Sequence, residues 1–274
     1  KVMQIRNDYQ LAWEIRGKYG DERRTEIENV SGEMDIEDLI PVEGTVITMT
    51  GLGYIKRMSV DNFKAQNRGG KGIKGMHTLN EDAIERIFIT STHHSILFFT
   101  NKGRVYKMKA YQIPEASRTA RGTAIVNLLQ LQAEEKIAAA MVIEEFKNAR
   151  NLIMATKKGL IKKTELSEYN NIRQTGIIAI TLREDDELID ADMTTGSREI
   201  VLITKKGQSI RFNESEVRPT GRSSMGVTGI RFADPDDEVI TLALDIQGED
   251  ILFATENGMG KRDGRHKECH ANRI

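Results

Sequence analysis

One loop of the sequence combines closely spaced glycines with lysine and arginine, a combination that suits phosphate binding. It spans residues 66–75 and reads Gln-Asn-Arg-Gly-Gly-Lys-Gly-Ile-Lys-Gly. Glycine lets backbone N–H groups approach a phosphate closely, and Arg68, Lys71 and Lys74 add positive charge. The loop lacks the Gly-x-x-x-x-Gly-Lys-Ser/Thr spacing and the following helix of a nucleotide-binding P-loop. We therefore predict that it contacts the phosphates of a nucleic acid.

Basic residues also recur at regular intervals along the chain. Lys and Arg outnumber Asp and Glu by 22 to 6 in four segments, residues 51–76, 102–122, 157–176 and 205–226. Acidic residues gather between these segments. If the segments stack around an axis, their cations form a continuous positive band that suits the phosphate backbone of duplex DNA. The predicted DNA-binding rim comprises Lys56, Arg57, Lys74, Lys102, Arg104, Lys107, Arg118, Arg121, Lys157, Lys158, Lys162, Lys163, Lys205, Lys206, Arg211 and Arg222.

Other interpretations of these cations stay open. Lysines on exposed hairpins can simply be solvated, and a positive band can also bind acidic proteins. The chain holds 40 Lys and Arg against 41 Asp and Glu, which excludes a wholly basic DNA-coating protein. Aromatic residues make up only 5% of it. This favours duplex over single-stranded nucleic acid, because single strands are bound largely by stacking on aromatic rings.

The basic segments belong to a repeat of about 50 residues. Each copy has an apolar run, then Thr-x-x-Gly, and the turn glycines are Gly53, Gly103, Gly159, Gly207 and Gly258. Each repeat is interpreted as four short strands, and glycine supplies the positive φ that closes the first hairpin. One blade cannot bury both faces alone. We therefore predict an all-β, propeller-like array of about five four-stranded blades, the last incomplete, with a solenoid as the alternative.

The two ends of the chain differ from the repeats. Apolar residues at helical spacing predict one helix over residues 1–20, followed by a linker. We therefore expect residues 1–38 to form a helix and linker, and residues 39–262 to form the bladed domain. Residues 263–274 replace the remaining strands of the fifth repeat, and we expect a basic tail that is disordered or cut short.

The sequence indicates no further chemistry. Its one cysteine, Cys269, excludes an intramolecular disulfide and suits a reducing cytoplasm, and no apolar run is long enough to span a membrane. His266, Cys269 and His270 share a terminal tail, and three such ligands do not predict a metal site. No Ser/His/Asp or paired-carboxylate arrangement stands out, so we predict no catalytic residue in this chain.

The glycine-rich loop resembles a known heptapeptide. Gln66, Asn67, Arg68, Gly69, Gly70, Lys71 and Gly72 are similar to the gyrase A box, found in the C-terminal DNA-wrapping domain of the bacterial DNA gyrase A subunit. The repeats resemble the β-pinwheel of that domain, and residues 19–27 resemble the passage leading into it from the breakage-reunion core. Asn67 stands where the family usually has a basic residue, which lowers the charge of the box by one. The related topoisomerase IV subunit has a pinwheel without an intact box, so the box favours gyrase.

This resemblance implies a function for the whole enzyme. Duplex DNA would bend around the pinwheel rim so that strand passage introduces negative supercoils, driven by ATP on the B subunit. The implied partners are double-stranded DNA, the gyrase B subunit, plus a second A subunit in a heterotetramer. Mg, ATP and the cleavage tyrosine would belong to other parts of a cytoplasmic, nucleoid-associated bacterial enzyme, with no membrane contact and no cofactor in this chain. The alternatives are a propeller-type protein-interaction scaffold and the C-terminal domain of a topoisomerase IV subunit.

Overall fold

The chain divides into two compact units, Lys1–Leu39 and Ile40–Ile274, in a computed structural model. The structure describes residues 2–20, 36–63, 76, 78–79, 82–144, 146, 150–244, 250–254 and 259–264. The predicted box (66–72), Lys74 and the tail from residue 265 onward lie outside the described residues. In the described parts of the chain, no helix has both the length and the apolar character needed to cross a membrane.

The first unit contains a single α-helix, α1 (Val2–Tyr19), and a 3-10 turn, η1 (Ile36–Leu39), within its described residues. The helix predicted over residues 1–20 is confirmed. It ends at Tyr19, and the N–H of the next residue, Gly20, donates to the carbonyl of Arg16 at 2.9 Å. Tyr9, Trp13 and Tyr19 are 72%, 75% and 76% exposed, so these aromatic rings are not packed within the described part of their own unit.

The second unit is built from antiparallel β-strands, as the repeats predict. Its strands are β1 (Gly44–Thr50), β2 (Tyr54–Ser59), β3 (Ile84–Ser91), β4 (Ser95–Thr100), β5 (Arg104–Lys109), β6 (Thr123–Ala124), β7 (Ile137–Ile143), β8 (Asn151–Thr156), β9 (Leu160–Glu165), β10 (Ile177–Ile178), β11 (Leu188–Thr194), β12 (Glu199–Thr204), β13 (Ser209–Asn213), β14 (Val227–Thr228), β15 (Val239–Leu244), β16 (Asp250–Ala254) and β17 (Gly260–Gly264). Short 3-10 turns join them, namely η2 (Val60–Asn62), η3 (Ala110–Gln112), η4 (Ile125–Asn127), η5 (Leu166–Tyr169) and η6 (Glu214–Glu216).

The Thr-x-x-Gly signature closes each first hairpin by local chemistry. Four turn glycines, those before β2, β5, β9 and β13, have φ between 73° and 86°, which glycine adopts without a steric penalty. The buried threonine hydroxyl three residues earlier accepts from the amide after the glycine at 3.0 to 3.3 Å. The glycine-closed hairpin is therefore confirmed in four repeats, and Gly258 lies outside the described residues.

Each of the first three blades takes its outer strand from the following repeat. The sheet orders are β3-β1-β2-β6, β10-β5-β4-β7 and β11-β8-β9-β14. The two-residue strands β6, β10 and β14 pair with β2, β5 and β9 of the repeat before. In all three blades the amide after the exchanged strand also donates to the carbonyl of the preceding repeat's turn glycine at 2.8 Å. The all-β, bladed array is confirmed, but the assignment of all four strands to one repeat is wrong.

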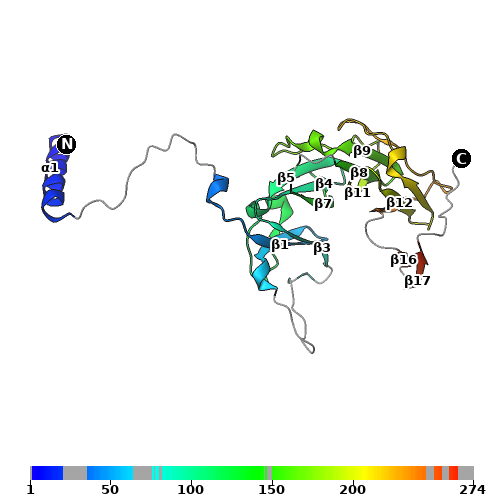
Figure 1. The fold of residues 1–274 in the computed structure, drawn as a ribbon, viewed down its shortest axis with the longest axis horizontal. Coiled ribbons are helices and arrows are strands. Elements are labelled where there is room, and N and C mark those ends of the chain that lie inside the picture. Colours follow the sequence, from blue (N-terminus) through cyan, green and yellow to red (C-terminus); the bar gives the residue numbers. More distant parts are fainter. Residues whose placement is uncertain are drawn as a thin grey trace, which may run out of the picture. The chain divides into compact units, whose positions relative to one another are not determined.

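The blades are held together by apolar clusters between consecutive sheets. Ile47 and Ile55 of the first blade pack with Phe98 of the second, and two similar clusters join the second to the third and the third to the fourth. Figure 1 shows these blades following one another along an arc, from blue and cyan to yellow. Strand β11 contacts β7 of the blade before it and β15 of the blade after it, so these three strands form the inner side and the exchanged strands lie on the outer side. In the described residues the fourth sheet is β13-β12-β15 and the fifth is the hairpin β16-β17.

Candidate nucleic-acid interface

The predicted rim residues that the structure describes do not form one surface. Three lysines are buried, two arginines are paired with surface carboxylates, five lysines lie at the hairpin turns, and the rest lie on the outer side of the blades. The two paired arginines are Arg57, 3.4 Å from the Glu115 carboxylate, and Arg211, which pairs with Glu199. Lys74 and the whole box lie outside the described residues, so their contact with DNA stays a prediction.

The three buried lysines are a correction to the predicted rim. Lys56 and Lys162 are fully buried, and Lys163 is 5% exposed. Their ammonium groups donate to backbone carbonyls of the following repeat, for example Lys163 Nζ to the carbonyl of Glu214 at 2.8 Å. The prediction that these lysines are exposed is wrong, because loops of the next repeat cover the strands that carry them. An ammonium held in this way is not available to a phosphate.

The burial of Lys162 has a consequence for pH-dependent stability. Burial and, secondarily, the charge of Arg222 lower the pKa of Lys162 from 10.5 to about 8, against a weaker raising effect of Glu168. Between pH 8 and 10.5 the unfolded chain therefore binds a proton that the folded chain does not. The free energy of unfolding should rise with pH across this window, by at most about 3 kcal/mol from this group.

Denaturant titrations at pH 7.5 and pH 9.5 would measure this contribution as the difference between wild type and Lys162→Met. The variant should show a smaller rise in the free energy of unfolding than the wild type. An identical rise in the two proteins would contradict a charged, desolvated ammonium at this position.

The hairpin-turn lysines lie beside acidic residues. Lys158 and Lys206 each donate a backbone N–H to an aspartate of the acidic turn in their own repeat at 2.9 Å. Glu238 forms ion pairs with Lys157 at 3.0 Å and with Lys205 at 3.1 Å, and these two cations lower the pKa of Glu238. Lys206 also pairs with Asp234.

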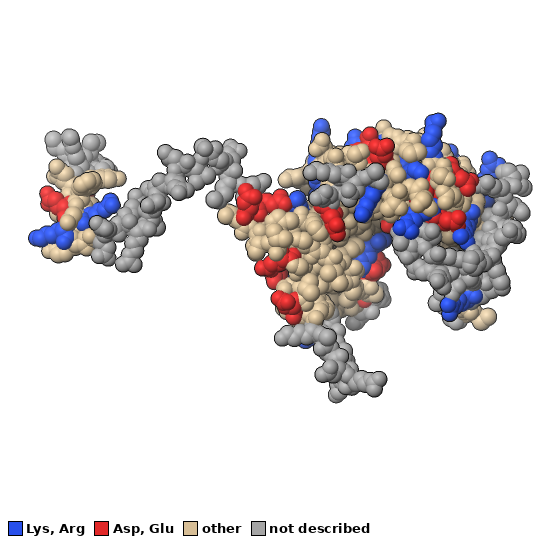
Figure 2. Space-filling view, viewed as in Figure 1, with Lys and Arg blue, Asp and Glu red and all other residues tan. Residues whose placement is uncertain are grey.

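These pairs correct the predicted charge pattern. The sequence places acidic residues in segments between the basic ones, but in the first, third and fourth repeats an aspartate of the acidic turn accepts a backbone N–H of the hairpin turn in the same repeat. Lys102 and Lys157 even share a hollow of about 510 Å³ with three carboxylates, Asp185, Asp186 and Glu187. Figure 2 shows blue and red residues interspersed on the visible face of the second unit. The band is therefore interrupted at the hairpin-turn edge, because opposite charges lie side by side there.

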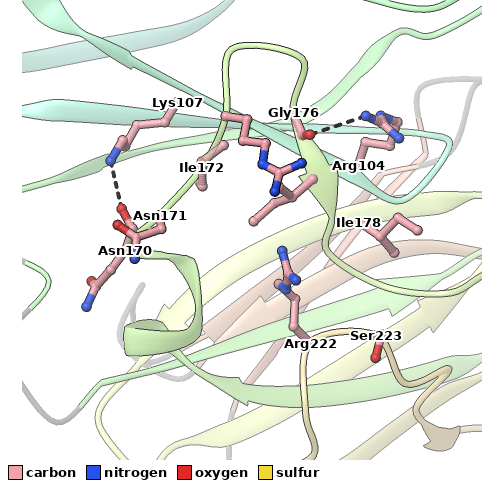
Figure 3. Close-up of a pocket in the computed structure, with 11 residues that line it drawn as sticks. Arg104, Lys107, Asn170, Asn171, Ile172, Gly176, Ile178, Arg222 and Ser223 are labelled. Carbon is pink, nitrogen blue, oxygen red and sulfur yellow. Dashed lines mark hydrogen bonds between the residues drawn. The ribbon is translucent and has the colours of Figure 1, made fainter.

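Positive charge is concentrated instead on the outer side of the second and third blades. A pocket of about 690 Å³ lies there, lined by Arg104, Lys107, Arg173, Arg222 and the backbone around Gly176 (Figure 3). No carboxylate is among the described residues that line it. Arg222 reaches into it from the loop of the fourth repeat, whereas Arg104 and Lys107 come from β5 of the second. Cations from three successive repeats therefore meet at one site.

Backbone contacts fix the two cations of β5. Arg104 Nη2 donates to the carbonyls of Thr175 at 2.6 Å and Gly176 at 3.3 Å, while its Nε lies 3.7 Å from a buried carboxylate oxygen of Glu135. Lys107 Nζ donates to the carbonyl of Asn170 at 2.8 Å. Burial and, secondarily, a neighbouring lysine lower the pKa of Lys107. Both side chains remain half-buried rather than covered, so they can still face an anion.

We define the outer basic surface as Arg104, Lys107, Arg118, Arg121, Arg173 and Arg222. Arg118 and Arg121 are exposed on the loop before β6, and the Arg121 guanidinium lies 5.6 Å from the centre of the Tyr54 ring. Arg173 was absent from the predicted rim, although it is exposed and lines the pocket. The first four repeats each have a second glycine 17 to 19 residues after the turn glycine, namely Gly72, Gly122, Gly176 and Gly226. The sequence signal of Arg173 is its position three residues before Gly176, in a loop that also carries cations in the other three of these repeats.

An antiparallel array of blades that exchange their outer strands defines the class of propeller-like β-pinwheels. This chain belongs to the family described as "DNA gyrase C-terminal domain, beta-propeller". The family model matches residues 44–91, 94–144, 150–195, 198–244 and 249–262.

Individual relatives agree with this assignment. The A subunit of DNA gyrase from Clostridium acetobutylicum is 57% identical over 216 residues, which is 79% of this chain and 26% of that protein, so the chain spans about a quarter of its length. The C-terminal domain of DNA topoisomerase IV superposes with a TM-score of 0.71 at 27% identity, over 82% of this chain and 69% of that one. The C-terminal domain of DNA gyrase A superposes with a TM-score of 0.63 at 26% identity, over 82% of this chain and 73% of that one. The fold is therefore shared by both enzymes, and the higher sequence identity favours the A subunit of gyrase.

Proposed function

We propose that the second unit binds duplex DNA on its outer basic surface and bends it, as the DNA-wrapping domain of a gyrase A subunit. The observation that carries this proposal is the pocket in which Arg104, Lys107, Arg173 and Arg222 converge, with no carboxylate among its described lining residues. Cations along an outer edge attract the phosphate backbone, which carries one negative charge per about 1.7 Å of duplex. Family membership supports the same function.

The geometry favours phosphate contacts over base reading. The cations come from successive repeats, whose blades follow one another along an arc (Figure 1), so they form a curved series of charges. Two of them, Arg104 and Lys107, are anchored to backbone carbonyls. None of the contacts described above places a recognition helix or a β-ribbon where it could enter the major groove. Phosphate contacts position a duplex without reading its sequence. Binding should therefore be strong at low salt and nearly independent of sequence.

In the complete protein this unit would serve a type II topoisomerase. We propose that it presents bent DNA for strand passage in a heterotetramer of two A and two B subunits. ATP, Mg and the cleavage tyrosine would act in those other parts, in the bacterial cytoplasm and on the nucleoid. The residues described above would supply binding and curvature only.

Charge reversal in the pocket tests the DNA-binding proposal. The double variant Arg173→Glu with Arg222→Glu should lower duplex affinity by tenfold or more at low salt, equally for unrelated DNA sequences, and should reduce the slope of log K against log salt. Filter binding over a salt series measures both effects.

The matched control is Lys205→Glu with Lys206→Glu, which changes the net charge by the same amount at the hairpin-turn edge. Its affinity should fall much less, because these lysines are already paired with Glu238 and Asp234. Equal losses in the two double variants would indicate a response to net charge alone. Failure of the wild type to bind duplex DNA, together with binding of acidic proteins, would instead favour an interaction scaffold.

A further inference from the structure

Two buried lysines occupy equivalent places in the first and third repeats. Lys56 and Lys162 each lie three residues after the turn glycine of their repeat, on β2 and β9, and both are fully buried. A buried ammonium is costly unless hydrogen bonds satisfy it. The residues that supply those bonds indicate what the two lysines do.

Lys56 holds a basic loop of the second repeat by its backbone. Its Nζ donates to the carbonyls of Ser117 at 3.1 Å, Arg118 at 2.6 Å and Ala120 at 3.0 Å. The same loop carries the exposed side chains of Arg118 and Arg121 on the outer basic surface. The ammonium therefore lies beneath the loop, and the guanidinium groups lie above it.

Lys162 makes the same kind of contact from the third blade. Its Nζ donates to the carbonyl of Arg222, in the loop of the fourth repeat, and to the carbonyl of Ala179 at 2.7 Å. Arg118 and Arg222 hold the same place in their repeats, four residues before the second glycines Gly122 and Gly226. In both cases the buried lysine therefore binds the carbonyl of a residue whose side chain belongs to the outer basic surface.

The second glycines show that these loops lie directly on the lysine strands. A Cβ atom added to Gly122 would lie 2.5 Å from the Ile55 carbonyl oxygen and 3.0 Å from Lys56 Cβ. A Cβ atom added to Gly226 would lie 2.6 Å from the Ile161 carbonyl oxygen and 3.0 Å from Lys162 Cβ. The close approach of the glycines and the hydrogen bonds from the lysines together fix each loop in place on the preceding blade.

The second repeat has no lysine at this place. Tyr106 occupies it, and its hydroxyl donates to Glu135 Oε2 at 2.7 Å and not to the basic loop of the next repeat. That loop is held from its exposed side by Arg104 and Lys107 instead. Tyr106 therefore provides a natural comparison with the two lysine positions.

We propose that Lys56 and Lys162 are positioning residues for DNA binding. Each holds the basic loop of the following repeat in the place from which the arginine side chains of that loop reach the duplex. This inference rests on the proposed function. Neither ammonium touches DNA. A loop that is already ordered loses less conformational entropy when it binds, so its arginines contribute more of their interaction energy to affinity.

Replacement of Lys56 by methionine tests this role, because methionine fills the space without donating a hydrogen bond. Lys56→Met should lower duplex affinity about tenfold, close to the effect of Arg118→Ala with Arg121→Ala. The triple variant, with Lys56→Met, Arg118→Ala and Arg121→Ala, should bind duplex DNA no more weakly than the double arginine variant. A general loss of structural integrity would not show this coupling, because it would act regardless of the loop arginines.

Lys162→Met, Arg222→Ala and their combination repeat the same affinity comparison at the second lysine position. Tyr106→Phe is the matched control and should bind DNA like the wild type. Amide hydrogen exchange should quicken at residues 117–122 in Lys56→Met and around Arg222 in Lys162→Met. Wild-type affinity in both lysine variants, or losses that multiply with those of the arginine variants, would overturn the positioning role. Failure of the wild-type chain to bind duplex DNA would overturn the proposed function itself.

Discussion

Replacement of residues 66–72 by alanine in the complete enzyme should abolish negative supercoiling, with decatenation and ATP-driven relaxation largely retained. The change removes the charges of Arg68 and Lys71 and the glycines that allow close approach to phosphate. The outer basic surface remains, so duplex binding should persist at reduced strength. A bent duplex resists elastically by a few kcal/mol, and we expect the wrap to stay incomplete when one end of the arc is released.

Plasmid topology after incubation with the reconstituted enzyme, both of its subunits present, measures this effect. Lys205→Ala with Lys206→Ala is the control, since it also removes two positive charges but leaves the box intact. That control should supercoil at close to the wild-type rate. If the box variant supercoils as fast as the wild type, the box acts only as a turn and its assignment as a DNA-binding element is wrong.

Glu214→Ala should lower the free energy of unfolding by about 3 to 5 kcal/mol, as expected when one partner of a buried ion pair is removed. The Glu214 carboxylate is fully buried, accepts from the Arg198 N–H at 2.6 Å and from the Thr194 hydroxyl, and lies 4.0 Å from Lys163 Nζ. Its loss would leave the Lys163 ammonium buried beside a carbonyl alone. Urea titration at neutral pH measures the difference.

The half-exposed pair of Arg211 and Glu199 provides the control. Glu199→Ala should cost less than about 1 kcal/mol, because solvent screens such pairs. Similar costs at Glu199 and Glu214 would contradict a structural role for the buried pair. Because Lys162 and Lys163 are buried against backbone carbonyls, reversing both to glutamate would disrupt the fold and would not test DNA contact.

Local chemistry explains why much of the fold is predictable from the sequence. The hairpin turns depend on a threonine hydroxyl, an amide four residues later and a glycine between them, all within five positions of the chain. The turns recur at a regular spacing, so the bladed array follows from the pattern. The helix over residues 2–19 follows in the same way from apolar residues at helical spacing.

The placement of the cations was decided only by the tertiary structure. Lys56 and Lys162 follow the turn glycine just as surface lysines of a hairpin would, but a loop from the next repeat covers them. Each such loop lies about 60 residues further along the chain than the lysine that holds it. A local pattern does not show which distant loop folds over a strand. The predicted rim therefore contained both true surface cations and buried ones.

The same reason explains the strand exchange and the mixed charge at the hairpin turns. The two-residue strand β10 pairs with β5 about 70 residues earlier, and a segment this short has no periodicity that identifies its partner. The acidic turns follow their hairpins by about 30 residues, and they meet the turn lysines because their aspartates cap the turn amides. By itself, the sequence determined the repeat, the turns and the sign of the charge on each segment. The tertiary structure decided which charges face solvent, because contacts between repeats cover some of them and neutralise others.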